Sequence, residues 1–315
     1  PPSLGDRVPS AEARRARILP LVLLTGAVVF WGTSFAATKT ALDSFAPMTV
    51  IWLRMCVAAI VIAPFLARIP RPRYRAGDWK LLAVSGLFIP CFYYLLEGYA
   101  IRFTTSSQAG VVSAVVPLLV AAGAWVFLKE RLTARSVIAI AASLAGVAML
   151  SLGATGQASA SNPLLGNTLE LLAMVAAAGS MISIKRLTEH YDAWFLTGMQ
   201  AMVGTVFFLP FALADGLSRV TAAPPAAWAC VAYLGVFASL GAFGMYNSAV
   251  KLMPASRASL AINLVPAVAL ITGWLALGES LAPIQFVACA VIVGAVVFAE
   301  WGVDDSRMRL QTEKP

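Results

Sequence analysis

The sequence predicts an all-α integral membrane protein with ten transmembrane helices, arranged as two inverted five-helix repeats. Three observations predict this fold: an apolar composition, ten apolar runs of membrane-spanning length, and a similarity between the two halves of the chain. Of the 315 residues, 60% are hydrophobic and 12% are charged, and the mean hydropathy is +0.81. A soluble domain carries about 25% charged residues, so this composition excludes an ordinary soluble enzyme, a disordered chain and a secreted disulfide scaffold.

The apolar runs have the length of membrane-spanning helices. A helix needs about 20 mostly apolar residues to cross a bilayer, and its backbone must satisfy its own hydrogen bonds there. The strands of a membrane barrel would be about ten residues long and would alternate in polarity, which these runs do not. The ten expected spans are 18–38, 47–67, 80–101, 106–128, 134–153, 164–184, 193–214, 226–250, 255–277 and 281–300.

A similarity between the two halves appears when the second half is shifted back by 149 residues, or by 146 residues near the start of each half. Matches of tryptophan, proline, glutamate and lysine are informative, because chance matches between apolar runs involve mainly alanine and valine. The matched pairs include Trp79 with Trp228, Pro117 with Pro266, Trp125 with Trp274, Glu130 with Glu279, Ser34 with Ser180 and Lys39 with Lys185. The chain is therefore expected to contain an internal repeat.

Each repeat holds five spans, and an odd number predicts that the two copies cross the membrane in opposite directions. Lysine and arginine are enriched in cytoplasmic loops. With the N-terminus inside, 19 of the 23 lysines and arginines fall on the cytoplasmic side. The expected organisation is a cytoplasmic tail at 1–17, repeats at 18–153 and 164–302, an extracytoplasmic linker at 154–163, and a cytoplasmic tail at 303–315. The net charge of +8 then reflects topology and does not indicate a nucleic-acid partner.

Inverted repeats form a bundle with a site near the membrane midplane, and rocking between mirror-related states gives alternating access. This arrangement predicts a secondary transporter for a small molecule. No GxxxxGK[ST] pattern occurs, so the energy for transport would come from a gradient, by exchange or facilitated flow, with proton coupling as a further alternative. An intramembrane enzyme is the first alternative, but no aspartate lies within the spans; a channel is the second, but no filter-like segment is evident.

The cysteines and the single histidine carry no signature of a cofactor or metal site. Cys56, Cys91, Cys230 and Cys289 lie singly in apolar runs, and His190 lies in a charged stretch. Disulfides and zinc sites require suitably spaced groups of such residues. The sequence therefore predicts no metal, no cofactor and no enzymatic activity.

Several segments resemble the drug/metabolite transporter superfamily, specifically the EamA-type ten-helix permeases. They are WGTSFAATK at 31–39, WLRMCVAA at 52–59, the run YAIRFTTSSQAGVVSAVVPLLVAAGAWVFLKERL at 99–132, and its echo SAVKLMPASRASLAINLVPAVALITGWLALGESL at 248–281. The resemblance implies a multi-pass protein of the bacterial inner membrane, a monomer or homodimer, that exports small metabolites. Amino-acid export of the YddG-like kind, with aromatic or apolar substrates, is one implied activity; multidrug or lipophilic-cation export is the alternative.

Charged side chains within spans are costly in lipid and usually face a cavity or a partner. Glu97 is a candidate proton- or cation-binding carboxylate; it could instead pair with Arg54 or Arg102, or reach the interface. Arg54 occupies the place of an arginine common in the second helix of the family, and we expect a structural or gating role. Glu170, about six residues into its helix, is expected at the interface.

Aromatic and polar side chains on shared helix faces are the candidate substrate-binding groups. An aromatic face with a few polar groups suits aromatic or amphipathic solutes, although packing within the bundle is the alternative for each residue. The expected substrate-binding residues are Trp31, Ser34, Tyr93, Glu97, Tyr246, Asn247 and Asn263.

Lys39 and Lys185, at equivalent helix ends, are candidate interface anchors or gating residues. Pro117 and Pro266 interrupt the fourth helix of each repeat and could act as hinges or as static bends. The loop carboxylates Glu130 and Glu279 lie just before the fifth helix of each repeat, and we expect them to cap those helices.

Overall fold

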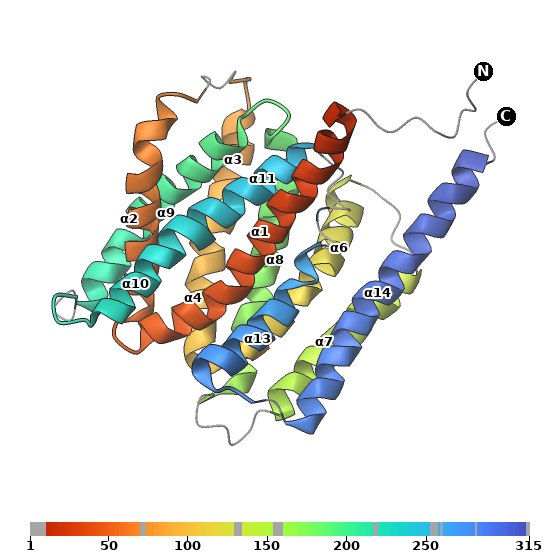
Figure 1. Ribbon diagram of the computed structural model, residues 1–315. Coiled ribbons are helices and arrows are strands. Elements are labelled where there is room, and N and C mark those ends of the chain that lie inside the picture. Colours follow the sequence, from red (N-terminus) through yellow and green to blue (C-terminus); the bar gives the residue numbers. More distant parts are fainter. Residues whose placement is uncertain are drawn as a thin grey trace.

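A computed structural model describes residues 11–69, 74–128, 134–153, 160–216, 220–252, 258, 261–280 and 282–312. Helices run side by side through these residues as one bundle (Figure 1), which confirms the predicted all-α class. The first half contains α1 (Ala11–Leu42), α2 (Pro47–Leu66), α3 (Asp78–Gly86), η1 (Leu87–Phe92), α4 (Tyr93–Phe103), α5 (Ser106–Val112), η2 (Ser113–Val115), α6 (Val116–Leu128) and α7 (Ala134–Gly153).

The second half repeats this order. It contains α8 (Pro163–Leu187), α9 (Ala193–Asp215), α10 (Pro225–Tyr233), η4 (Leu234–Ala242), α11 (Phe243–Leu252), α13 (Val265–Leu277) and α14 (Pro283–Thr312). Seven helical segments of the described chain are long and apolar enough to cross a membrane. Three shorter apolar helices, Val137–Leu150, Val265–Leu277 and Pro283–Ala295, occupy the remaining expected spans. The final helix continues to Thr312, beyond the expected end at residue 300.

The third span of each repeat is not one regular helix, contrary to the expected continuous spans. Wide turns of π type interrupt both spans: η1 separates α3 from α4, and η4 separates α10 from α11. The two interruptions fall at equivalent positions of the repeat. In η1 the backbone at Ile89 is non-helical and the Ile89–Pro90 peptide bond is cis. Breaks of this kind free backbone carbonyls that side chains from other helices can then bind.

The fourth span of each repeat is also interrupted, just before its proline. A 3₁₀ turn, η2, precedes Pro117, and a turn at residues 263–264 precedes Pro266, which lies in the first turn of α13. Proline is tolerated in the first turn of a helix, where its missing N–H would have no partner. The prolines therefore begin new helical segments and do not kink continuous ones.

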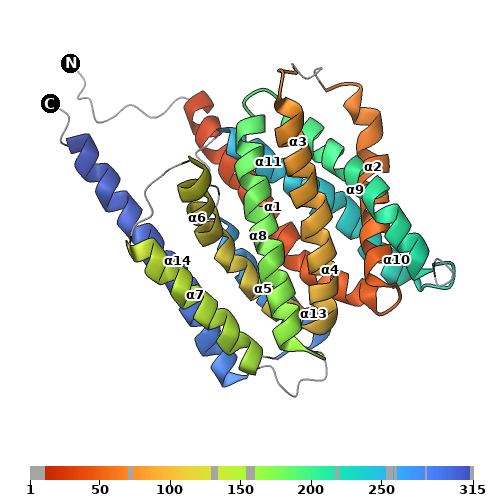
Figure 2. The same ribbon diagram turned by 180° about the vertical axis from the view of Figure 1, so that it is seen from behind.

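Two ends of the bundle are distinguished by their lysines. The turn after α1 lies at the lower end in Figure 1, which we call the Lys39 end; the turn after α8 lies at the upper end, the Lys185 end. Helices α7 and α14 pack along each other at one side of the bundle in both views (Figures 1 and 2). Gly146 permits this contact, because an added Cβ would meet Ile292 at 2.6 Å.

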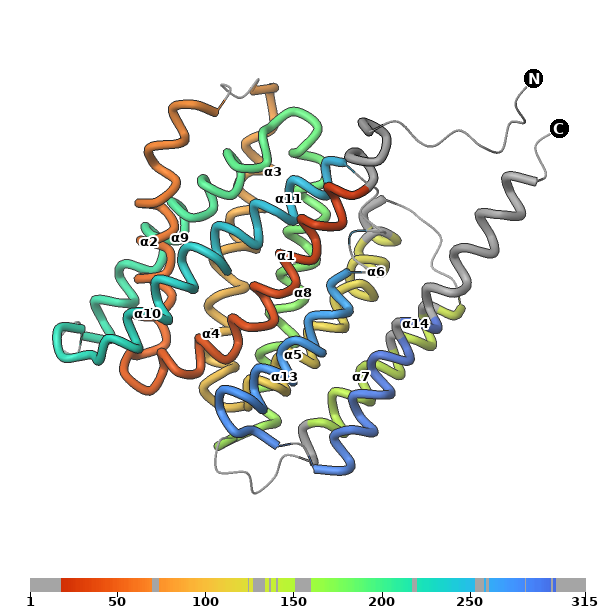
Figure 3. The backbone as a smooth tube through the Cα atoms, in the orientation of Figure 1, coloured from red at the N-terminus to blue at the C-terminus, as the bar shows by residue number. Residues whose placement is uncertain are grey.

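The remaining helices surround the centre of the bundle, where α1 and α8 lie beside the interrupted spans (Figure 3). Large apolar side chains also cover the outward faces, where Val206 is 74% and Trp274 66% exposed. Such exposure would be costly in water and suits contact with lipid. Buried polar side chains lie in the interior, and the candidate site is built around some of them.

Candidate functional site

A narrow cavity lies between the two halves of the bundle. Its volume is about 40 Å³, which holds a few water molecules at most. Both repeats contribute to its mostly apolar wall. The lining residues are Trp31, Ser34, Phe35, Ile89, Tyr93, Ser113, Val116, Met174, Ala177, Met181, Phe243, Ile262 and Val265.

Trp31 of α1 is the main aromatic group of this wall. Its ring centroid lies 5.1 Å from that of Phe243 and 5.4 Å from that of Tyr246. The indole Nε1 is buried and has no hydrogen-bond partner among the described residues. The Ser34 hydroxyl donates to the Trp31 carbonyl at 2.7 Å. The structure thus leaves an unused N–H donor at an aromatic cavity wall.

A buried charge cluster extends from the cavity. The Tyr93 hydroxyl, at the cavity wall, donates to Glu97 Oε1 at 2.5 Å. Glu97 Oε2 lies 3.7 Å from Arg54 Nη1, and both side chains are almost fully buried. The structure therefore contains one of the alternatives for Glu97, the ion pair with Arg54.

Arg54 joins three helical segments. Its guanidinium also donates from Nε to the Ser239 hydroxyl of η4 at 2.8 Å, and its Cζ lies 4.5 Å from the ring centroid of Tyr94. The ion pair, the hydrogen bond and the cation–π contact tie α2 to α4 and to the wide turn of the other repeat. Arg54 therefore links these segments to one another close to the cavity.

Glu170 corrects an expectation. It was expected at the membrane interface, but its side chain is 0% exposed. α8 packs directly against α4, so a residue near the helix end faces protein. Both carboxylate oxygens lack a hydrogen-bond partner in the described part of the chain, and Glu170 interacts electrostatically with Glu97.

The other expected binding residues lie around the cavity at different distances from its wall. Tyr246 is buried and packs against Trp31 with its ring tilted by 50°. The Asn247 amide donates to the Thr197 hydroxyl at 3.1 Å and so faces α9. Asn263 lies in the turn before α13, and not in the middle of a helix as expected. The structure thus brings Trp31, Ser34, Tyr93, Glu97 and Tyr246 together. Asn247 contacts α9 instead, and Asn263 is not among the residues that line the cavity.

Lys39 and Lys185 make equivalent contacts at opposite ends of the bundle. Lys39 Nζ donates to the carbonyls of Ile101 and Thr104 at 2.8 and 2.7 Å. Lys185 Nζ donates to the Val250 carbonyl at 3.0 Å. Ile101 and Val250 are matched by the repeat offset of 149. Each lysine therefore binds the C-terminal carbonyls of the third span in its own repeat, where a cation is favoured.

Glu279 also differs from expectation. Instead of capping its own helix, it accepts hydrogen bonds from the backbone N–H groups and hydroxyls of Ser106 and Ser107, at distances of 2.6–3.0 Å. It therefore caps α5 of the other repeat, whereas Gln285 accepts from the Ala282 N–H before α14. Serines at the start of α5 were the available sequence signal for this site. The equivalent Glu130 lies outside the described residues.

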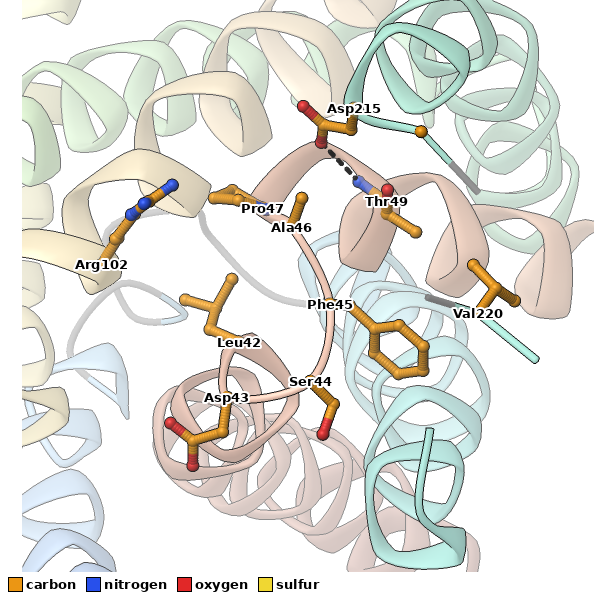
Figure 4. Close-up of a pocket in the computed structure, with 11 residues that line it drawn as sticks. Leu42, Asp43, Ser44, Phe45, Ala46, Pro47, Thr49, Arg102, Asp215 and Val220 are labelled. Carbon is orange, nitrogen blue, oxygen red and sulfur yellow. Dashed lines mark hydrogen bonds between the residues drawn. The ribbon is translucent and has the colours of Figure 1, made fainter. Parts of the chain in front are cut away.

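A larger pocket of about 460 Å³ opens at the Lys39 end (Figure 4). The turn after α1 forms one wall, with Arg102 of α4 and Asp215 of α9 around it. The Thr49 N–H donates to Asp215 Oδ2 at 3.3 Å. No sequence pattern marks this pocket, because its charged side chains come from three separate helix ends.

An apolar bundle built from two similar halves, with a small cavity and buried charged groups between them, has the architecture of a membrane transporter. The chain belongs to the EamA-like transporter family, which it matches twice, over residues 18–152 and 164–301. This confirms the predicted family and transport class.

Several relatives carry transporter names. The chain is 25% identical to the "Uncharacterized transporter YetK" of Bacillus subtilis over 87% of this chain and 84% of that protein. It is 27% identical to a "Probable terminal-alkyne amino-acid exporter" of Streptantibioticus cattleyicolor, over 86% of this chain and 89% of that protein. A solved crystal structure matches the fold with a TM-score of 0.58 at 21% identity, over 89% of this chain and 98% of that chain.

Proposed function

We propose that this protein is a secondary transporter that exports amino acids with apolar or aromatic side chains by alternating access. The observation that carries the proposal is the composition of the cavity. Trp31 offers an unused N–H donor, which suits a carboxylate, and the surrounding wall is aromatic and apolar. Glu97 lies one hydrogen bond behind Tyr93, and an ammonium group that displaces the Tyr93 hydroxyl would donate to the same carboxylate oxygen. A relative named as a probable amino-acid exporter supports the same substrate class.

The topology proposed with this function follows the charge distribution. Repeats at 18–153 and 164–302, joined by a linker at 154–163, would cross the bacterial inner membrane in opposite directions with both termini in the cytoplasm. The Lys185 end would then face the cytoplasm and the Lys39 end the outside. The excess of lysine and arginine on one side supports this orientation, and the matched contacts of the two lysines support the inversion.

Export of lipophilic cations is the second candidate, because Glu97 and Glu170 place two carboxylates in the bundle interior. Counterflow in proteoliposomes separates the candidates. Vesicles preloaded with unlabelled phenylalanine, leucine or lysine, or with tetraphenylphosphonium, would be diluted into the labelled compound. Accumulation of phenylalanine and leucine supports amino-acid export; accumulation of tetraphenylphosphonium alone supports the second candidate. Accumulation of none of them contradicts the carrier proposal.

The variant Trp31→Phe sharpens this test, because it retains an aromatic ring and removes the N–H. We expect weaker binding, seen as a several-fold higher KM for phenylalanine counterflow. Trp125→Phe is the matched control on an exposed position. An unchanged KM for Trp31→Phe would remove Trp31 from the substrate site.

A further inference from the structure

Glu170 is a buried acidic group that the proposed substrate contacts leave unused. Its side chain is 0% exposed, and neither oxygen has a hydrogen-bond partner within the described residues. An ionised carboxylate without donors is so costly in an apolar interior that the group takes up a proton instead. By contrast, the buried carboxylate of Glu279 accepts four hydrogen bonds.

The charge balance around Glu170 also favours its protonated form. Glu97 is the carboxylate close enough to Glu170 for electrostatic interaction, and Tyr93 lies near both. Arg54 is the cation of this cluster, and its contacts are to Glu97, Tyr94 and Ser239. One guanidinium can neutralise only one of two neighbouring carboxylates. Since Glu97 has both the ion pair and the Tyr93 hydrogen bond, Glu170 is the member that remains uncompensated.

The other elements packed against α8 supply no compensating charge near Glu170. α5, η2 and the described part of α6 contain apolar, hydroxyl and amide side chains, and η1 contributes only the thiol of Cys91. The charged side chains of α3, α4, α7 and α11 besides Glu97 lie in the first or last turn of their spans; they are Asp78, Lys80, Arg102, Arg135 and Lys251. Lys185 and Arg186 lie at the far end of α8 itself.

Glu170 also lies on the face of α8 that reaches the cavity. Met174, Ala177 and Met181 line the cavity, and Glu170 precedes Met174 by one helical turn on the same face. Tyr93 provides a second connection, because it lines the cavity and donates to Glu97. A substrate that displaces Tyr93 would therefore change the hydrogen bonding of Glu97 and its repulsion with Glu170.

We propose that Glu170 is a proton-binding site that couples transport to proton movement. In the conformation described here Glu170 is protonated and Glu97 is ionised against Arg54. When substrate enters and displaces Tyr93, the proton leaves Glu170 for the water on the side from which the substrate came, and a proton from the water on the opposite side replaces it after the substrate has left. No other bond forms or breaks. The coupling rests on the proposed transport function, whereas the protonation of Glu170 does not.

Infrared spectroscopy of the purified protein at neutral pH tests the protonation. The wild type should show the carbonyl stretching band of a protonated carboxylic acid, with a shift in D₂O. Glu170→Gln, and Glu170→Met as a second variant, should lose this band while eluting as folded protein from gel filtration. Glu279→Gln, the matched buried control, should retain it. Absence of the band in wild type, or its persistence in both Glu170 variants, would overturn the proposal.

Proteoliposomes with an imposed pH gradient test the coupling. The readout is the phenylalanine flux with the gradient divided by the phenylalanine flux at equal pH on both sides. If another amino acid gives stronger counterflow than phenylalanine, that amino acid is used in its place. We expect a ratio above one for wild type and a ratio of one for Glu170→Gln. Equal ratios above one would overturn the coupling. A correct infrared result without any amino-acid flux would contradict the proposed function and leave the proton site standing.

Discussion

The two repeats share a backbone scaffold but differ in where they carry charge. In both, a polar side chain of the second span binds the wide turn in the third span of the other repeat: Arg54 binds Ser239, and Gln200 donates to the Ile89 carbonyl at 3.0 Å. Arg54 and Gln200 occupy matched positions in the two repeats. Ile89 and Ser239 are one residue away from matching. The charged members, however, belong to the first repeat, since Glu97 is matched by Tyr246 in the second.

This difference separates two roles within the transporter. The matched contacts hold equivalent interruptions in place within the two third spans, and this symmetry is what the proposed alternating-access cycle needs. The unmatched charges gather on one side of the cavity, where Glu170 of α8 joins them in place of the matched Leu24 of α1. The matched contacts therefore belong to the scaffold that the repeats share, and the unmatched charges belong to the candidate site between them.

The largest expected effect comes from Arg54→Gln, which gives the first repeat the amide of the second. Glu97 would then lie buried beside Glu170 without a cation, and breaking a buried ion pair costs about 3–5 kcal/mol. Thermal unfolding in detergent should show a marked fall in Tm. The double variant Arg54→Gln/Glu97→Gln should recover much of the loss. A Tm equal to wild type for Arg54→Gln would show that the pair does not stabilise the bundle.

The two lysines offer a matched test at opposite ends. Lys39 donates to two carbonyls, and Lys185 donates to the Val250 carbonyl. Hydrogen bonds from charged donors contribute about 1.5–3 kcal/mol, so both Lys39→Met and Lys185→Met should lower stability, the former by more. Denaturation of both variants in one detergent measures this. A loss confined to one variant would break the equivalence of the two ends.

A smaller effect is expected from Gln200→Leu, which removes the amide that binds the Ile89 carbonyl and the Ser85 hydroxyl. Leaving a buried carbonyl without this donor should cost about 1–2 kcal/mol. Val203→Leu, on an outward position of the same helix, is the control. Equal unfolding temperatures for the two variants would mean that the second repeat does not need this contact.

The smallest effect concerns Tyr191, which matches Phe45 in the other repeat. Phe45 packs on Trp228, whereas the Tyr191 hydroxyl donates to Asp78 at 2.9 Å. Burial, and secondly Asp78, raise the pKa of Tyr191 from 10.0 to about 12. The pKa of Tyr191 is higher in the folded than in the unfolded protein. Its contribution to stability is therefore complete below pH 10 and is lost as the pH rises to about 12.

Tyr191→Phe should therefore unfold like wild type at neutral pH, within about 1 kcal/mol, and should lose less stability between pH 10 and about 12. Unfolding followed across this pH range measures the difference. An identical decline in both proteins would show that Tyr191 ionisation does not affect the fold.

Much of the scaffold could be predicted from the sequence, because length and apolarity report membrane spans directly. The cavity groups Trp31 and Tyr93 also follow from helix faces. The pairing of Glu97 with Arg54 is one of the alternatives that the cost of buried charge leaves open. The interruptions in the third and fourth spans could not be predicted, because they lie in continuous apolar runs that carry no signal for a change in helical turn.

Two carboxylates show why the rest of the site needed the structure. Glu170 lies near a helix end, where the sequence alone favours the interface, and only the packing of α4 on α8 buries it. Glu279 precedes a helix in sequence but caps α5, which is distant in the chain. Contacts between separate repeats decide both cases, and local pattern does not encode them.

The most direct test of substrate passage between the repeats is to fill the cavity. Ala177 of α8 lines it, and Ala177→Phe would occupy its volume. Leu172→Phe, on the same helix with a side chain 48% exposed, is the matched control. Counterflow of phenylalanine in proteoliposomes should be lost in Ala177→Phe and retained in Leu172→Phe. Equal counterflow in the two variants would contradict a substrate path through this cavity.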